Sequence, residues 1–454
     1  MNSLHGLRGR LSISLILLLL ALFWTVQAAG ETGSEPGGRK VIEGVGGFPL
    51  DRDSGSMCLH ALLSCLKATG NPSVYYNLVG FSRSAFKFVY DSTEAYEPLR
   101  DLYPVDVLRQ AAVAEGYPES RWETNRSINT VKSLIKQEID SGRPVIAPFL
   151  KNDAYHGFFV IAGYDYEQEI FYLQGALDLD SGYVSVPIPD YWDGPTASPA
   201  GWARNPVFVL GEKKAGLEKK GAHERESVET GIGLYRGGTL EYGTQPGERE
   251  YMAAPGPHTA RYGIPAFDLL SRDVESAPIL IQRDGAEVVN FGLLWRLDAQ
   301  LGQLDHDRFY GMTYVRGISR YLRFDERMLL TEITENFERT TADVRDLRRI
   351  FLNPVPDWCA DADDVMRYIE RENSIVYWIP DGETMAPGLE ALGLDTHNTP
   401  WGTVAVLDSP EKRFRAKVLV KSIASREKNS LYVMEDIVEH IGRLKPEDLR
   451  PGSE

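Results

Sequence analysis

The chain has 454 residues, which is too long for one ordinary hydrophobic core and predicts two domains. Hydrophobic residues make up 43% of the chain and charged residues 25%, as in ordinary globular proteins. The formal net charge of −16 favours solubility and argues against non-specific binding of nucleic acid. No cluster of Lys and Arg interleaved with aromatic residues opposes that expectation.

Residues 1–28 have the three-part layout of a secretory signal peptide. Arg8 and Arg10 precede an almost wholly apolar run at 11–24, and Val26 and Ala28 suit cleavage after Ala28. The alternative is an uncleaved membrane anchor, but the run is near the lower limit of about 17 residues for a spanning helix. We therefore expect export to the periplasm or the extracellular space, with no stable membrane insertion after cleavage.

The segment 29–41 is polar and rich in glycine, and it predicts a disordered leader before the globular chain begins at residue 42. Helical spacing of apolar residues predicts helices at 58–68, 73–81, 104–117 and 127–142, the last with a Ser127 cap and a Ser-Gly end. Runs rich in Val, Ile, Phe and Tyr then predict strands at 143–150, 156–164, 169–176 and 206–211. This order predicts an α+β domain with an antiparallel sheet over 42–210.

The second half of the chain is predicted to be mostly helical. A charged run at 211–227 is expected to be a linker or a solvated helix face, followed by a helical domain at 228–454. Its predicted helices cover 261–276, 289–304, 305–322, 326–352 and one or two long helices at 409–444. Short segments at 374–380 and 401–408 predict a small β element.

The stretch SGSMCLHALLSCL at 54–66 places Cys58 on the first turn of a predicted helix. The positive end of the helix dipole and the unpaired N–H groups there favour a thiolate, and the same N–H groups can stabilise an oxyanion. The alternative is a buried structural thiol, which fits Cys65 in mid-helix. Cys58 and Cys65 lie about 10 Å apart on one helix, beyond the disulfide limit of about 7 Å, so with Cys359 as the third cysteine at least one thiol stays unpaired.

His156 is the best candidate for a base that activates Cys58. It opens a predicted strand after the polar turn KNDAY, where it can meet a helix N-terminus across a cleft. His60 lies two positions after Cys58 on the same helix and points elsewhere, while His258 and His306 lie in the helical region. A lone histidine is usually not catalytic, so the order of a cysteine on a helix and a histidine on a strand carries the prediction.

Four segments resemble the papain-like domain of the bacteriocin-leader (double-glycine) peptidases. In chain order they are SGSMCLHALLSCLKATG, LVGFSRSAFKFVYD, SGRPVIAP and HGFFVIAGYD. They resemble still more closely the butirosin biosynthesis protein H family, which has a G-x-S-x-x-A-F segment and a C-terminal helical domain that opens with Y-G-x-x-A. The resemblance covers 42–210 well and 225–355 loosely. The matching residues here are Gly80, Ser82, Ala85 and Phe86, then Tyr262, Gly263 and Ala266.

The resemblance implies that Cys58 is a nucleophile with His156 as its base, and that the acyl group passes to water or to an amine. The chain departs from the peptidases at two supporting positions. Arg52 stands where they have an oxyanion-binding Gln, and Gln174 stands in the strand where they have an Asp that orients the histidine. Asp165 is an alternative orienting residue, although it also suits a hairpin turn.

The sequence therefore predicts an exported cysteine-peptidase-like protein that acts on a peptide or acyl substrate. A catalytically degenerate binding protein of the same fold is one alternative, because of the two departures. An amine acyltransferase is the other, although its carrier-protein thioester donor is cytosolic. We expect no cofactor and no metal, since the acidic groups at 178–182 and 361–364 read as a turn and a helix start, and no phosphate-binding loop or zinc motif is present.

Overall fold

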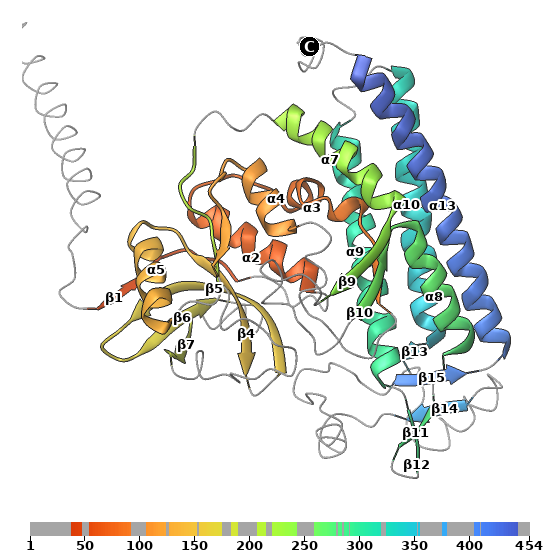
Figure 1. Ribbon diagram of the computed structural model, residues 1–454, viewed down its shortest axis with the longest axis horizontal. Coiled ribbons are helices and arrows are strands. Elements are labelled where there is room, and N and C mark those ends of the chain that lie inside the picture. The colour runs from red at the N-terminus through yellow and green to blue at the C-terminus, as the bar shows by residue number, and fades with distance from the viewer. Residues whose placement is uncertain are drawn as a thin grey trace, which may run out of the picture.

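The computed structural model describes most of the chain between Gly38 and Arg443 (Figure 1). The described residues are 38–47, 54–91, 106–123, 127–151, 154–174, 183–188, 207–214, 220–242, 258–277, 280–283, 286–289, 291–318, 324–351, 353–354, 375–378, 404–408 and 410–443. The expected signal peptide at 1–28 lies outside them. Among the described residues, no helix is both long and apolar enough to cross a membrane.

A seven-stranded antiparallel sheet forms the centre of the N-terminal half, in the order β3-β8-β4-β5-β6-β7, with β1 also paired to β5. The four predicted strands correspond to β4, β5, β6 and β8, so the α+β class with an antiparallel sheet is confirmed. The bounds are β1 Arg39–Val41, β3 Arg121–Glu123, β4 Val145–Lys151, β5 Ala154–Asp165, β6 Ile170–Gln174, β7 Val184–Pro187 and β8 Val207–Val209.

Strand β1 corrects the prediction of a disordered leader that extends to residue 41. Arg39, Lys40 and Val41 pair with Asp165, Tyr164 and Gly163 of β5. A side chain at 163 would put its Cβ 2.5 Å from the carbonyl oxygen of Lys40, so only glycine allows this approach. The polar composition of 39–41 does not predict a strand. The strand forms because its hydrogen bonds come from a partner more than 120 residues away along the chain.

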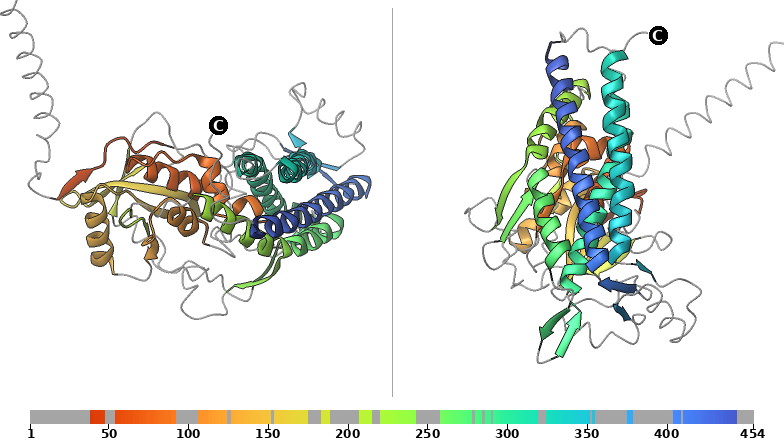
Figure 2. Two further views of the ribbon diagram at one scale, coloured as in Figure 1. Left: turned by 90° about the horizontal axis from the view of Figure 1, so that it is seen from above. Right: turned by 90° about the vertical axis from the view of Figure 1, so that its right-hand side faces the viewer.

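Helices cover both faces of the sheet, as Figure 2 shows for α2 and α5. Alternate residues of β4 and β5 explain this: Ile146 and Val160 belong to the buried cluster with α2, whereas Val145 and Ile161 belong to the cluster with α5. The helices of this half are α2 Ser54–Ala68, α3 Tyr75–Phe81, α4 Val107–Ala114 and α5 Ile128–Asp140. Ser127 accepts a hydrogen bond from the N–H of Thr130, which confirms the predicted cap.

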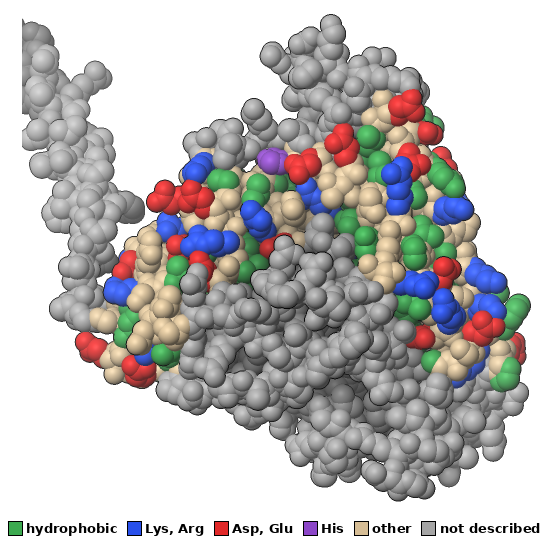
Figure 3. Space-filling model, in the orientation of Figure 1, with side chains coloured by type: hydrophobic (Ala, Val, Ile, Leu, Met, Phe, Trp, Pro, Cys, Tyr) green, Lys and Arg blue, Asp and Glu red, His purple; other side chains and the backbone are tan. Residues whose placement is uncertain are grey.

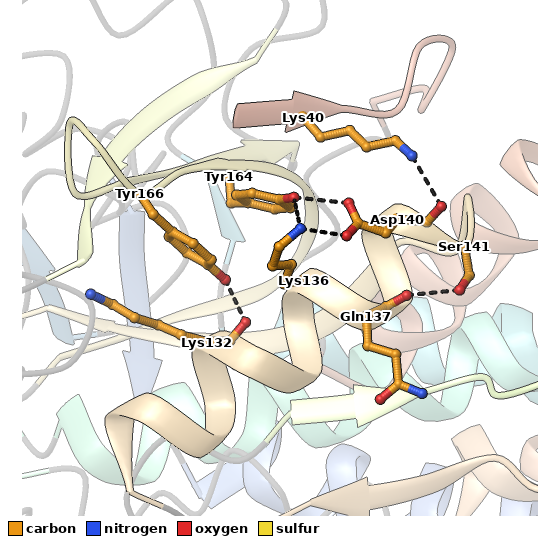
Figure 4. A network of polar contacts seen from close by, with 8 residues as sticks. All are labelled: Lys40, Lys132, Lys136, Gln137, Asp140, Ser141, Tyr164 and Tyr166. Carbon is orange, nitrogen blue, oxygen red and sulfur yellow. Dashed lines mark hydrogen bonds and ion pairs between the residues drawn. The ribbon is translucent and has the colours of Figure 1, made fainter. Parts of the chain in front are cut away.

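Polar contacts hold α5 on the sheet (Figure 4). The Lys136 ammonium donates to the Asp140 carboxylate at 2.5 Å and to the Tyr164 hydroxyl at 2.8 Å, and that hydroxyl donates to Asp140 at 2.8 Å. The Tyr166 hydroxyl donates to the carbonyl of Lys132 one turn away. The hydrogen bond to Asp140 raises the pKa of Lys136. Partial burial alone would raise the pKa of Asp140, but the hydrogen bonds from Lys136 and Tyr164 outweigh it and lower that pKa.

The C-terminal half is a set of long helices beside the sheet domain (Figure 1). Two helices were predicted within 289–322, but 291–318 is one helix, α9, and 410–443 is also a single helix, α13. Part of the charged run at 211–227 is helical, since α7 begins at Lys220. The bounds are α7 Lys220–Arg236, α8 Ile264–Ser276, α9 Phe291–Ile318, α10 Phe324–Phe351 and α13 Pro410–Arg443.

Short strands accompany the helices in three small sheets, with orders β2-β10-β9, β11-β12 and β13-β15-β14. The expected β element corresponds to β14 and β15. The bounds are β2 Val89–Asp91, β9 Gly238–Tyr242, β10 His258–Tyr262, β11 Leu280–Arg283, β12 Ala286–Val289, β13 Asn353–Pro354, β14 Ile375–Trp378 and β15 Val404–Asp408.

One buried cluster joins the two halves. It runs from Cys58 and Leu62 of α2 through Tyr314 of α9 and Phe337 of α10 to Met434 of α13. Strand β2, from the N-terminal half of the sequence, pairs with β10 from the C-terminal half. The two halves therefore share one buried cluster among the described residues, although the sequence suggests a boundary at 211–227.

Candidate functional site

Cys58 lies in the second turn of α2, because the helix begins at Ser54, four residues earlier than the sequence predicts. The thiol is completely buried in the large cluster, and Cys65 is buried as well, with neither in a disulfide. Burial raises the pKa of the Cys65 thiol far above its usual value. Cys65 therefore has the structural role that the sequence predicts for it.

Helix α2 packs directly on β5, the strand that contains His156. Cys58 shares its buried cluster with Phe158 and Val160, which are two and four residues after His156 on that strand. The fold therefore brings the helix of one predicted catalytic residue against the strand of the other, across 98 residues of sequence. The side chain of His156 lies outside the described part of the structure.

The pairing of β4 and β5 is irregular beside His156. Pro148 pairs with Phe158 and Leu150 pairs with Tyr155, so one residue of β4 lies opposite the two residues His156 and Gly157. This is the residue count of a β-bulge, which bends the strand and redirects a side chain relative to the regular alternation. The backbone at His156 thus departs from the ladder at the candidate base.

Gln174 ends β6 and pairs directly with Val160 of β5. Directly paired residues have side chains on the same face of a sheet, so Gln174 is on the face that α2 covers. Its side chain is buried and makes polar contacts. Of the two predicted orienting residues, Gln174 is the one on the side of Cys58.

Asp165 ends β5 at the opposite end from His156. Nine residues separate them along the strand, which corresponds to about 30 Å at about 3.3 Å per residue. The Asp165 carboxylate accepts hydrogen bonds from the N–H groups of Glu167 and Gln168, at 3.1 and 3.0 Å. It therefore stabilises the β5–β6 turn, which is the alternative role that the sequence suggests for it.

The G-x-S-x-x-A-F segment joins the two halves of the molecule. A Cβ at Gly80 would lie 2.1 Å from the ring of Tyr314, so the missing side chain makes room for that ring. Ala85 lies against Gly311 of α9, and Phe86 lies against Gly231 of α7. The motif that resembles the butirosin protein family has a packing role here.

The Y-G-x-x-A segment has a similar role at the start of α8. Gly263 has a φ of +68°, and a Cβ there would lie 2.3 Å from the carbonyl oxygen of Leu234. Its N–H donates to the carbonyl of Phe88 at 2.9 Å, and Ala266 is completely buried. This segment therefore fixes α8 against both α7 and the chain near β2.

Several features predicted from the sequence lie outside the described residues. Arg52, Cys359 and the acidic segments 178–182 and 361–364 lie outside them. Among the described residues, no group of three or more His, Cys, Asp or Glu could hold a metal ion. Acidic and basic side chains are intermixed over the described surface in the view of Figure 3.

One polar group was missed by sequence reasoning. The Tyr75 hydroxyl of α3 lies 3.1 Å from Nε2 of His306 in α9, and the ring of His60 in α2 stacks on Tyr75 with 3.9 Å between centroids. Neither His60 nor His306 is a candidate site residue from the sequence alone. No local pattern could have joined them, because 231 residues separate Tyr75 from His306.

No protein-family model matches the chain, and no match is found among curated proteins.

Proposed function

We propose that this chain is an exported, papain-like cysteine enzyme that acts on a peptide or acyl bond. Cys58 is the nucleophile, His156 the general base, and Gln174 the hydrogen-bond partner of the imidazole. The observation that carries the proposal is the packing of α2, with Cys58, on β5, with His156, on the face that also has Gln174. The sequence resemblance to the leader peptidases and the butirosin protein family supports it.

The start of α2 supplies the electrostatic part of the proposed site. The first four N–H groups of a helix lack acceptors within the helix, and here they belong to Ser54–Met57. Because Cα–Cβ bonds tilt toward the helix N-terminus, a thiol in the second turn is directed back toward these groups. They favour a thiolate and are suitable donors to an oxyanion.

In the proposed reaction, His156 takes the proton of the Cys58 thiol and the thiolate attacks the carbonyl carbon. The carbonyl oxygen becomes an oxyanion, and the imidazolium then gives its proton to the leaving amine as the old bond breaks. The acyl group remains on sulfur as a thioester. Water, deprotonated by His156, attacks that thioester, and the departing thiolate is protonated again while the acid is released.

The complete burial of Cys58 favours a second candidate, a binding protein of the same fold without catalysis. A substrate can reach the thiol only if a covering part of the chain moves. The replacement of the orienting Asp by Gln174 favours this candidate too, because an amide stabilises an imidazolium less than a carboxylate does.

Alkylation by iodoacetamide between pH 5 and 10 distinguishes the two candidates, with Cys359 replaced by Ser and modified sites read by mass spectrometry. For the enzyme, we expect Cys58 to react at pH 7 with a midpoint well below the unperturbed value of about 8.5. His156→Gln should move the midpoint toward that value.

Cys65 is the internal control, because burial raises the pKa of its thiol and it should stay unmodified throughout. If Cys58 and Cys65 react only together, after unfolding, the enzyme proposal is refuted and the binding protein is supported.

A further inference from the structure

A cluster of aromatic and imidazole rings joins α2 and α3 to α9. Tyr75 is at its centre, stacked on His60 with an angle of 13° between the rings and packed edge-on against Tyr310 at 4.7 Å. Its hydroxyl is 3.1 Å from Nε2 of His306, whose ring also contacts Tyr310 at 4.8 Å. The cluster links the helix that contains Cys58 to the helical half.

Asp307 follows His306 in α9 and is completely buried. Neither of its carboxylate oxygens accepts a hydrogen bond from a described residue, and Nδ1 of His306 lies 3.5 Å from Oδ1. A buried carboxylate without a cation is costly, so this position demands a positive partner.

The other charges of this part of α9 are already paired. Arg308 forms an ion pair with Glu427 of α13, and Asp305 forms one with Arg345 of α10. Among the described residues, the contacts of His306 include His60 from α2, Tyr75 from α3, and Asp307 and Tyr310 from α9 itself. Arg308 also interacts electrostatically with Asp307, but its guanidinium is hydrogen-bonded to Glu427. Among the described residues, His306 is thus the cationic partner of Asp307 whose charge can be lost near neutral pH.

We propose that His306 is a protonation-dependent latch between α9 and the α2–α3 pair. In the imidazolium, Nδ1 lies 3.5 Å from the Asp307 carboxylate and Nε2–H donates to the Tyr75 hydroxyl, so one charged ring joins the buried acid to the ring stack. When His306 loses its proton, Asp307 loses this ion pair and the contact weakens. The latch does not depend on catalysis by Cys58.

The direction of the pH dependence follows from the partners of His306. Asp307 favours the charged ring, whereas its own burial, with 10% of the side chain exposed, and the nearby ring of His60 oppose it. In the proposed latch Asp307 prevails, so His306 holds its proton more tightly in the folded state than in the unfolded chain. The stabilisation is then complete below the unfolded value of about 6.5 and is lost as pH rises through the folded value.

Histidine ¹³Cε1 NMR of the full chain tests the latch. Titration from pH 5 to 9, with His306 assigned by its absence in His306→Gln, should give a midpoint above about 6.5. Asp307→Asn should lower that midpoint by about one pH unit or more. His223 of α7 serves as the reference whose midpoint stays unchanged.

Thermal unfolding gives the second readout. The melting temperature of His306→Gln should fall below that of the native chain by more at pH 5.5 than at pH 8.5. A His306 midpoint that is the same in Asp307→Asn, or a melting difference independent of pH, overturns the latch. If neither variant folds, the native chain still decides, because midpoints below about 6.5 for every histidine exclude a charged His306 at neutral pH.

Discussion

The guanidinium of Arg308 in α9 forms a completely buried ion pair with the Glu427 carboxylate of α13, 119 residues later in the chain. Nε lies 3.0 Å from both carboxylate oxygens, and Nη1 donates to the carbonyls of Ala85 and Lys87 at 2.8 and 3.2 Å. Burial alone would lower the pKa of Arg308, but Glu427 outweighs it and keeps that pKa above its usual value. One side chain thus joins the G-x-S-x-x-A-F segment to two helices.

Removing one partner of this pair should be more harmful than removing both. Glu427→Met leaves a buried guanidinium without its counter-charge, and we expect it to lower the free energy of unfolding by about 3–5 kcal/mol. Arg308→Met with Glu427→Met should cost clearly less than the sum of the single variants. Urea unfolding of the four proteins at pH 7 measures this, and additive costs would contradict a coupled pair.

Gly80 and Gly233 should respond oppositely to alanine, although both lie within helices. A Cβ at Gly80 would lie 2.1 Å from the Tyr314 ring, so Gly80→Ala should cost about 1–3 kcal/mol by overpacking. Gly233 of α7 is exposed with nothing within 4 Å, so Gly233→Ala should gain about 0.5–1 kcal/mol from helix propensity. Thermal unfolding checks the signs. A stabilising Gly80→Ala would mean that Tyr314 does not fill that space.

The contacts of α5 predict a limited pH window of stabilisation. The pKa of Asp140 is lowered, so its contribution is present above about 4 and lost as pH falls further. The pKa of Lys136 is raised, so its contribution is present below about 10.5 and lost at higher pH. Tyr164→Phe, which removes the hydroxyl between them, should cost about 1 kcal/mol at pH 7 and less at pH 3.

The matched control is Tyr166→Phe, because that hydroxyl donates to the neutral carbonyl of Lys132. Its cost should not follow the titration of Asp140. Urea unfolding at pH 3, 4 and 7 compares the two variants, and a parallel loss in both would show that the Lys136–Asp140 contacts are not the source of the pH dependence.

Gln174 should control the reactivity of Cys58 if it orients the imidazole of His156. We expect Gln174→Ala to slow alkylation of Cys58 at pH 7 by between about 10-fold and 10⁴-fold. The upper limit is the loss of catalytic rate seen when the carboxylate of a catalytic triad is neutralised. Gln174→Asp should retain or increase the rate. Gln137→Ala, at an exposed position on α5, is the control. Equal rates in all four proteins would remove Gln174 from the site.

Elements whose signals are local were predicted well. The helix α5 has its cap in Ser127 and a left-handed glycine at Gly142, just after its last residue, with a φ of +75°. Strands β4, β5, β6 and β8 follow from runs of branched and aromatic residues, because burial on both faces of the sheet demands such runs. The predicted packing of the Cys58 helix near the His156 strand also follows from this order of elements.

Elements that depend on distant partners were missed or misplaced. The polar residues of β1 form a strand only because β5 supplies hydrogen bonds, and α2 extends back through Ser54 and Gly55, which have weak helix propensity. The choice of a partner for His156 also depends on strand pairing between distant parts of the chain. The sequence puts Gln174 in the strand of the orienting residue and offers Asp165 as the alternative, and the strand register then places Asp165 at a turn and Gln174 opposite Val160.

The sequence by itself determined the α+β class, the strongly patterned helices and strands, and the identity of the candidate nucleophile and base, because hydrophobic periodicity and caps act within a few residues. Only the tertiary structure decided which polar side chains meet. The Arg308–Glu427 pair and the Tyr75–His306–Asp307 contacts join residues from distant parts of the chain. Their energies depend on burial and on the paired charges around them, which exist only after the helices have packed.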